Sequence, residues 1–280
     1  PDQELHIIGN VTINDSSSLG AIQINPTDNM ITFEGENGSL YQPVYGSDDD
    51  LVLYLPFSEN LVNISNTTYD RSPYGNDGTL TNMNSGNMTN GTGWSSGKYG
   101  NGIEFEGDAG YVVSASNVPA NLEAASLSAW IYTGDGSSRT KRILGSSGCY
   151  YCIRILNNND IQSNTYDGDN DIVTASNALI LNQWQYIVTT WDSTTLKLYV
   201  DGKFMGEVAA GAPSVADVLY VGQNGPSQPD STFNGTIDEV MVYERALAPE
   251  EIRTHYLRGS GFGASGAITA DKFRVVNTSG

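Results

Sequence analysis

The chain has 280 residues, enough for one or two domains with a sizeable core. Its net charge is −19, because 32 Asp and Glu outnumber 13 Lys and Arg. A surface this acidic repels phosphate backbones and anionic lipid, so nucleic acid is not an expected partner. The sequence contains no run of about 18 apolar residues, the length needed to cross a bilayer, and predicts no membrane span.

Composition predicts an all-β protein. The chain has 16 Tyr, 7 Phe and 4 Trp, which favour strands, and 31 Gly, which indicate many turns and loops. Charged residues make up 16% of the chain, below the globular average of about 25%, and neutral polar residues take their place, as is common in secreted proteins. The chain begins at Pro1 without Met or a signal segment, which suggests a processed product. We therefore expect an extracellular or cell-surface location.

Residues 1–50 form the first predicted segment. Three short strands are expected there, in residues 5–13, 21–24 and 30–33, separated by Asn, Asp, Ser and Pro turns. A piece of this size without cysteine is too small to bury a core of its own. We therefore expect an N-terminal β-segment that serves in docking or assembly.

Residues 51–258 form the main predicted domain. Within it, apolar and polar residues mostly alternate in residues 183–191 and 196–200, which is the period of a strand with one buried face. Asp201 and Gly202 follow the second of these strands, and this pair favours a type I′ hairpin turn because both positions need a positive φ. The pattern therefore predicts an antiparallel meander.

The order of the predicted pieces resembles the laminin-G-like, concanavalin A-like jelly-roll family. The pieces that carry the resemblance are residues 51–57, 70–78, 97–107, 127–131, 183–200, 235–243 and a short helix that begins with Pro249, Glu250 and Glu251. Proline suits the first position of a helix, and two glutamates complement its positive end. The resemblance implies an antiparallel two-sheet jelly-roll sandwich over residues 51–258, with small β-segments at both termini.

Residues 259–280 form the third predicted segment. A Gly/Ser-rich linker up to residue 266 precedes a strand at residues 268–276. Residues 9–13 and 266–270 share a Gly-x-aliphatic-Thr pattern, and both termini resemble the strand repeats of trimeric fibre shafts and archaeal surface proteins. A lone strand needs a sheet edge, so we expect it either to pack on its own jelly roll or to complete a neighbouring subunit by strand addition.

The sequence predicts no catalytic site. Glucanases of the resembling fold carry paired carboxylates in a Glu-x-Asp-x-Glu strand, whereas Glu104, Glu106 and Asp108 stand in another order. His6 and His255 are far apart in sequence and have no serine or cysteine motif around them, which favours structural roles. We therefore expect a protein that is not an enzyme.

A structural calcium ion is implied by the resemblance. Asp238 matches the aspartate that opens the last strand of the relatives, with the carbonyl of Gly107 as the expected second ligand and Asp70 as a possible third. The alternative is that Asp238 caps a β-turn. A second acidic cluster at residues 167–171 imitates an EF-hand loop but lacks its glycine and its last glutamate, so we expect a solvated hairpin tip.

Cys149 and Cys152 are the two cysteines of the chain. A redox pair would need a helix N-terminus after a strand, and a zinc site would need two more ligands. The remaining alternative is a disulfide across a tight turn, whose first and last residues lie within about 7 Å. We therefore expect a disulfide if the chain is exported.

Three tyrosines lie near this turn: Tyr150, Tyr151 and Tyr166. They can form a sugar-stacking platform, although aromatic strand residues more often belong to the core. Nine Asn-x-Ser/Thr sequons are further candidate sites, for glycan attachment. They begin at Asn10, Asn14, Asn37, Asn63, Asn66, Asn87, Asn90, Asn234 and Asn277.

Two functions fit these features. The first is a non-catalytic structural protein, a subunit of a surface fibre or appendage that self-associates through its terminal β-strands. The second is a carbohydrate-binding or adhesive lectin-like module whose partners are glycans. The fibre hypothesis explains the similar terminal strands, and the lectin hypothesis explains the family resemblance. We expect the fibre first and the lectin-like module second.

Overall fold

The structure of the chain is a computed structural model. It describes residues 12–13, 22–25, 30–33, 50–58, 66–81, 83, 93–107, 111–114, 123–136, 139–212, 218–224 and 231–261. The chain divides into two units: one comprises residues 49–256, and the other comprises residues 1–48 together with 257–280. The first of these coincides closely with the predicted jelly roll. Each unit is described by itself.

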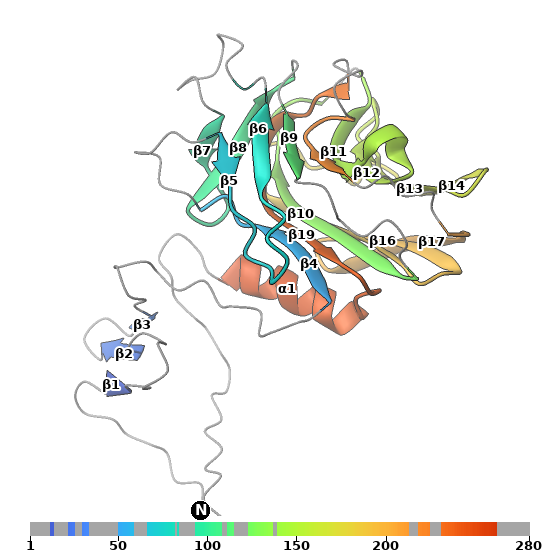
Figure 1. Cartoon of the computed structure of the whole chain (residues 1–280). Coiled ribbons are helices and arrows are strands. Elements are labelled where there is room, and N and C mark those ends of the chain that lie inside the picture. Colours follow the sequence, from blue (N-terminus) through green and yellow to red (C-terminus); the bar gives the residue numbers. More distant parts are fainter. Residues whose placement is uncertain are drawn as a thin grey trace, which may run out of the picture. The chain divides into compact units, whose positions relative to one another are not determined.

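A three-stranded antiparallel sheet belongs to the smaller unit (Figure 1). Its strands are β1 (Thr12–Ile13), β2 (Ile22–Asn25) and β3 (Met30–Phe33). Strand β2 pairs with both neighbours, with Thr12 opposite Gln23 and Ile24 opposite Ile31. Strands are therefore present at all three predicted positions, and the third has the predicted bounds. Residues 5–11 of the first predicted strand, residue 21 of the second and the C-terminal strand at 268–276 lie outside the described residues.

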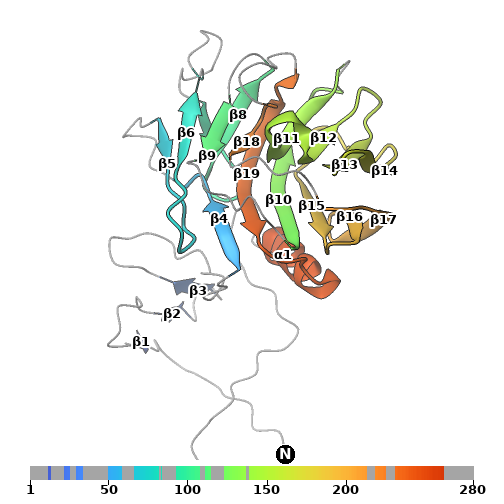
Figure 2. The same cartoon turned by 45° about the vertical axis from the view of Figure 1, so that its right-hand side comes forward.

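Two antiparallel eight-stranded sheets form the larger unit, and Figures 1 and 2 show them facing each other. Sheet I runs in the order β17-β16-β15-β10-β19-β8-β7, and β4 also pairs with β19. Its strands are β4 (Leu51–Leu55), β7 (Trp94–Ser96), β8 (Asn101–Glu106), β10 (Ala125–Tyr132), β15 (Gln185–Trp191), β16 (Thr195–Val200), β17 (Lys203–Ala209) and β19 (Asn234–Tyr243).

Sheet II runs in the order β14-β13-β12-β11-β18-β9-β6-β5. Its strands are β5 (Thr67–Thr68), β6 (Gly78–Thr81), β9 (Tyr111–Ser114), β11 (Lys141–Ser146), β12 (Tyr151–Ile155), β13 (Ile161–Tyr166), β14 (Asn170–Ala175) and β18 (Leu219–Val221). A short 3₁₀ turn, Ser147–Cys149, joins β11 to β12. Four of the seven neighbouring pairs in this order are consecutive strands, and the pairs β11–β18, β18–β9 and β9–β6 join strands distant in sequence, as in the predicted jelly-roll sandwich.

The inner faces of the two sheets form one apolar core. Alternation decides which side chains enter it: Leu127, Ala129 and Ile131 of β10 are buried in the core, and the same period holds along β12 for Ile153 and Ile155. Aromatic side chains fill the space at edge-to-face contacts, as between Phe105 and Phe233, whose ring centroids lie 6.3 Å apart. One face of each predicted alternating strand therefore enters the core, but in β15 the other face is buried as well, since every residue from Gln185 to Trp191 is buried.

The predicted hairpin turn at Asp201-Gly202 is confirmed. Both residues have positive φ, 52° and 72°, and they connect β16 to β17. The Asp201 carboxylate also accepts the backbone amide of Tyr186 at 2.9 Å. The turn is thereby attached to the neighbouring strand β15.

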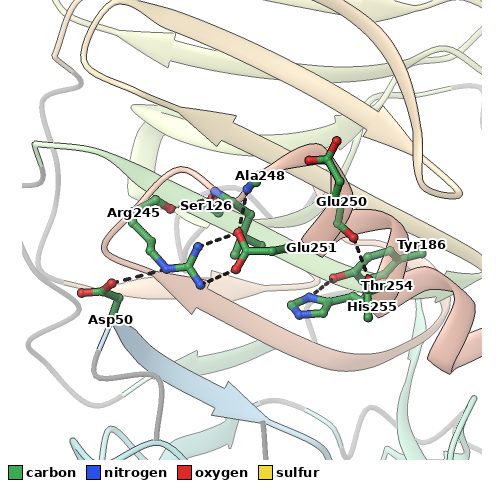
Figure 3. A network of polar contacts seen from close by, with 10 residues as sticks. Asp50, Ser126, Tyr186, Arg245, Ala248, Glu250, Glu251, Thr254 and His255 are labelled. Atoms are coloured by element: carbon green, nitrogen blue, oxygen red, sulfur yellow. Dashed lines mark hydrogen bonds and ion pairs between the residues drawn. The ribbon is translucent and has the colours of Figure 1, made fainter. Parts of the chain in front are cut away.

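Helix α1 (Pro249–Gly261) is longer than the sequence predicted, since residues 259–261 belong to its last turn and not to a linker. Glu251 lies in the first turn of this helix. Its carboxylate accepts hydrogen bonds from the amide of Ala248 and from both terminal nitrogens of Arg245, each at 2.8 Å (Figure 3). Arg245 also contacts Asp50, with Nε 3.3 Å from Oδ2. This network fixes the start of the helix beside β4 and β19.

The outer face of sheet I carries an aromatic cluster under α1. Trp130, which points away from the core, stacks on Tyr256 of the helix at 5.8 Å and lies 5.2 Å from the ring of Tyr186. The hydroxyl of Tyr186 lies 3.4 Å from Nδ1 of His255. These contacts explain why this face of a central strand is aromatic and why His255 is structural.

Among the described residues, none forms a helix with the length and apolar character that crossing a bilayer requires.

Candidate functional site

Asp238 is buried on the outer side of β19, where it caps the turn between β7 and β8. Its carboxylate accepts the amides of Tyr99 and Glu239 at 2.9 and 2.8 Å, and a further amide from Lys98. The turn comes so close that a Cβ atom on Gly97 would lie 2.6 Å from Asp238 Oδ2. Capping of a β-turn, the alternative considered for this residue, is therefore the role that the geometry supports.

The three residues expected to hold calcium do not form one site. Glu106 pairs with Asn234, and the amide of Gly107 donates to the carbonyl of Phe233, so Gly107 lies five ladder steps from Asp238, or roughly 16 Å at about 3.3 Å a residue. Asp70 instead organises its own turn and accepts the amides of Tyr54, Ser72 and Asn76 at 2.7 to 2.8 Å. In the described part of the chain, no group of three or more His, Cys, Asp or Glu is placed to bind a metal. Calcium binding itself stays a prediction.

Burial raises the pKa of Asp238 well above its usual value, and the adjacent charge of Glu239 raises it further. The three amide contacts act in the opposite direction but do not outweigh burial. Glu239 has a positive φ of 51° and lies beside a register shift between β10 and β19, and its carboxylate accepts the hydroxyl of Tyr54 at 2.8 Å. The two acids therefore tie β19 to β4 and to the β7–β8 turn.

The outer face of sheet II carries a different arrangement, a row of polar side chains across four strands. The register places Arg142 of β11 opposite Arg154 of β12, Arg154 opposite Gln162 of β13, and Gln162 opposite Thr174 of β14. Nε of Arg154 donates to Gln162 Oε1 at 2.6 Å, and Nε2 of Gln162 donates to Thr174 Oγ1 at 2.9 Å. The row therefore holds the guanidinium of Arg154 in a defined orientation.

Arg142 lacks a counter-charge in this row. Its side chain is 4% exposed, and its Nε and Nη1 atoms have no hydrogen-bond partner. Burial lowers the pKa of Arg142 to about 9, with the charge of Arg154 as the second cause. The guanidinium thus keeps its charge at neutral pH. Among the described residues no carboxylate pairs with Arg142 or Arg154, and a buried cation without an anion is costly.

A second row on the same face lies two residues away along β12 and β13, and three residues away along β11, where the register shifts. Asn164 lies opposite Cys152, and Cys152 lies opposite Gly145. Nδ2 of Asn164 donates to the carbonyl of Cys149 at 2.8 Å, while its Oδ1 atom is buried without a partner. An acceptor of this kind can be satisfied by a ligand hydroxyl.

Tyr150 and Tyr166 lie at one end of the outer face of sheet II. Their ring centroids are 5.6 Å apart, and both side chains are half-buried. The structure corrects the prediction for Tyr151, which points into the core because strand alternation turns it to the other face. Its hydroxyl donates to the carbonyls of Ala125 and Thr189 at 3.2 Å, and it is 2% exposed. The predicted stacking platform is thus reduced to Tyr150 and Tyr166.

The structure joins Cys149 and Cys152 in a disulfide across the turn that precedes β12, with Cα atoms 5.1 Å apart. Gly148 and Cys149 both have positive φ in this turn, 74° and 62°. The amide of Tyr166 donates to the carbonyl of Tyr150 at 2.8 Å. The crosslink therefore lies next to the two tyrosines.

The sequence did not predict a site at Arg142, Arg154, Gln162 and Asn164. One signal was available: residues 136–159 contain four basic residues and no Asp or Glu, in a chain with net charge −19. These basic residues are Arg139, Lys141, Arg142 and Arg154. The pairing of β11 with β12, which brings two of them face to face, is not visible in the sequence.

Other candidates lie elsewhere. The acidic cluster at residues 167–171 includes the exposed tip between β13 and β14, as predicted. Glu104 and Glu106 lie on β8 of sheet I, and Asp108 is outside the described residues. Two sequon asparagines are described: Asn66 is exposed, and Asn234 is half-buried with its amide 3.3 Å from Asp135 Oδ2. The other sequons lie outside the described residues: Asn10, Asn14, Asn37, Asn63, Asn87, Asn90 and Asn277.

Solved structures with similar folds include two kinds of protein. Domain 4 of AbnA, a GH43 extracellular arabinanase from Geobacillus stearothermophilus solved in complex with arabinotriose, is 19% identical with a TM-score of 0.55, and the match covers 73% of this chain and 97% of that domain. The receptor-binding domain of botulinum neurotoxin D is 16% identical with a TM-score of 0.56, and the match covers 75% of this chain and 53% of that one.

A ligand-binding domain of botulinum neurotoxin serotype D, solved in complex with N-acetylneuraminic acid, is also 16% identical, with a TM-score of 0.57 and coverage of 74% of this chain and 50% of that one. The chain thus spans about half the length of the neurotoxin domains. At these identities the similarity shows the fold alone. A search of the curated proteins found no match.

The family is shown by the sequence itself. The model of the concanavalin A-like lectin/glucanases superfamily, of the laminin G type, matches residues 105–253, slightly more than half of the chain. The match spans β9 to β19 and the start of α1, and so includes both rows on the outer face of sheet II. The chain therefore belongs to the concanavalin A-like lectin/glucanases superfamily.

Proposed function

We propose that the chain is a non-catalytic carbohydrate-binding module of an extracellular protein, and that the outer face of sheet II holds the sugar. One observation carries this proposal: buried polar atoms of Arg142 and Asn164 have no partner on a face that ends in Tyr150 and Tyr166. Sugar-binding sites combine hydrogen-bonding groups in fixed positions with an aromatic surface. This face has both.

The superfamily and its structural neighbours support the proposal. The arabinanase domain was solved with arabinotriose and the neurotoxin domain with N-acetylneuraminic acid, so similar folds occur in domains that bind sugars. The disulfide between Cys149 and Cys152 supports an oxidising, extracellular environment, because such crosslinks are rare in the cytosol.

The fibre hypothesis stays a prediction. It depends on the C-terminal strand at residues 268–276, which lies outside the described residues, and on a partner for the N-terminal segment. No contact among the described residues favours it over sugar binding. We therefore place the carbohydrate-binding module first, which reverses the order expected from the sequence. The two functions are compatible within one surface protein.

A glycan-binding assay with matched tyrosine variants tests the proposal. The full chain is screened against neutral and acidic oligosaccharides, and Tyr166→Ala is compared with Tyr74→Ala, a control at a side chain that is 52% exposed and distant in sequence. We expect Tyr166→Ala to weaken binding roughly tenfold, from loss of one stacking surface, while the control leaves the affinity unchanged. Absence of binding to every glycan, or equal affinity of the two variants, would reject the proposal.

A further inference from the structure

We propose that the sugar bound on the outer face of sheet II is acidic, with a carboxylate or sulfate group that lies against Arg142 and Arg154. This inference rests on the proposed function and adds the class of ligand. The site lacks a negative charge. The guanidiniums of Arg142 and Arg154 face each other across β11 and β12, and no anion among the described residues pairs with them.

The two facing arginines lower the stability of the protein while no ligand is bound. Like charges on opposed residues of neighbouring strands repel each other, and burial of Arg142 removes much of the water that would screen them. A protein that used these side chains only for packing would gain stability from apolar residues of similar size. An oxyanion between the two guanidiniums would remove the repulsion and satisfy the free Nε and Nη1 groups of Arg142.

One side chain of the site is also held in a fixed orientation before a ligand binds. The chain of hydrogen bonds from Arg154 through Gln162 to Thr174 orients one guanidinium before any ligand arrives. Pre-orientation of this kind reduces the entropy lost on binding. Asp160 is the next acid in sequence after Arg154, but it does not neutralise the charge of the two arginines. Its carboxylate instead accepts hydrogen bonds from the Asn177 amide and the Asn158 side chain at 2.7 and 2.8 Å.

Charge distribution in the chain supports an anionic ligand. The basic stretch at residues 136–159 is an exception within a chain of net charge −19. The acidic surface around it would repel polyanions in general, so binding of an acidic sugar requires a local cationic site. The tyrosine pair lies four residues from the arginine row, roughly 13 Å along the strands. A ligand that contacts both ends is therefore an oligosaccharide.

The test compares acidic oligosaccharides with neutral forms of the same backbone. The matched probes are oligogalacturonate and its methyl ester, sialyllactose and lactose, and a sulfated galactan oligomer and its desulfated form. Affinities are measured by calorimetry with the full chain. We expect at least one acidic member to bind roughly tenfold to a hundredfold more tightly than its neutral partner, as for a hydrogen bond to a charged group. The pair that shows the difference distinguishes carboxylate from sulfate.

Variants locate the effect. Arg154→Met and Arg142→Met should each remove most of the preference for the acidic probe, while Arg253→Met, which removes the same charge from an exposed position on α1, should retain it. Equal binding of acidic and neutral probes by the unaltered chain would overturn the acidic ligand and leave the carbohydrate-binding function intact. Binding to no probe would overturn both. A preference that survives both site variants would place the acidic ligand elsewhere and overturn this site.

Discussion

Asp238 and Tyr99 are 139 residues apart in the chain, yet the carboxylate of Asp238 accepts the backbone amide of Tyr99 at 2.9 Å. This bond holds the β7–β8 turn against β19. It also positions Lys98, whose Nζ lies 4.4 Å from the ring centroid of Trp130, over the cluster that α1 packs on. One buried carboxylate thus connects a hairpin, a central strand and the helix.

Replacement of Asp238 should therefore destabilise the domain. Asp238→Ala leaves the amides of Lys98, Tyr99 and Glu239 without their carboxylate acceptor, and we expect the free energy of unfolding to fall by about 2–3 kcal/mol, measured by urea titration. The pKa of Asp238 is raised in the folded state, so the native protein binds this proton more tightly than the unfolded chain does. The difference between the unaltered chain and Asp238→Ala should thus widen as pH falls from neutral, and a constant difference would contradict the raised pKa.

The same two proteins test for calcium. If Asp238 acts only as the cap that its three amide contacts describe, a chelator leaves the melting temperature of the unaltered chain unchanged. A chelator-dependent fall in the unaltered chain that disappears in Asp238→Ala would establish calcium at this residue.

Arg142→Met should stabilise the free protein. The substitution removes a buried charge that lacks an anion, and we expect a gain of about 1 kcal/mol in the free energy of unfolding. Arg253→Met is the control and should change it by less than about 0.5 kcal/mol, because the side chain is exposed. A loss of stability in Arg142→Met would indicate that the guanidinium has a structural role, and would weaken the case for an anionic ligand.

Glu251→Gln should loosen the start of α1. The hydrogen bonds from the Arg245 side chain are the largest cause that lowers the pKa of Glu251 below its usual value. Its contribution to stability is therefore present above that value and is lost as pH falls through the lower folded pKa. Because the side chain is 39% exposed, we expect a cost of only about 0.5–1 kcal/mol at neutral pH. Thermal melts at neutral and acidic pH check it, and the two proteins should converge in acid.

Removal of the disulfide should have a small effect on stability. Cys149 and Cys152 close a loop with a sequence separation of only 3, so little entropy is removed from the unfolded chain. The Cys149→Ser, Cys152→Ser double variant should melt within a few degrees of the unaltered protein. Its glycan affinity should fall more clearly if the turn positions Tyr150.

Mass spectrometry of the exported protein under non-reducing conditions should find no alkylatable thiol, and two free thiols would refute the crosslink.

Deletion of residues 268–280 tests the fibre hypothesis separately from sugar binding. The shortened chain should keep a folded jelly roll with unchanged glycan affinity, because the deletion lies beyond α1. If the terminal strand joins subunits, the full chain forms larger assemblies on size-exclusion chromatography and the shortened chain does not. Monomers in both cases at high concentration would reject the fibre and leave the carbohydrate-binding module.

The sequence by itself determined the elements of the fold. Strand alternation in residues 183–200, the Asp201-Gly202 turn and Pro249 at the start of α1 are local signals, because each depends on the period of a strand or on the φ of a single turn. The disulfide across the turn before β12 was predictable for the same reason. Their order along the chain then indicated the superfamily.

Tertiary structure alone decided the candidate site. Arg142 and Arg154 face each other only because β11 pairs with β12, and a register shift of one residue would turn each side chain to the other face. The same alternation placed Tyr151 in the core and left Tyr150 outside. Burial without a counter-charge is likewise a property of the assembled sheet, since an arginine in the sequence carries no sign of whether an anion lies beside it.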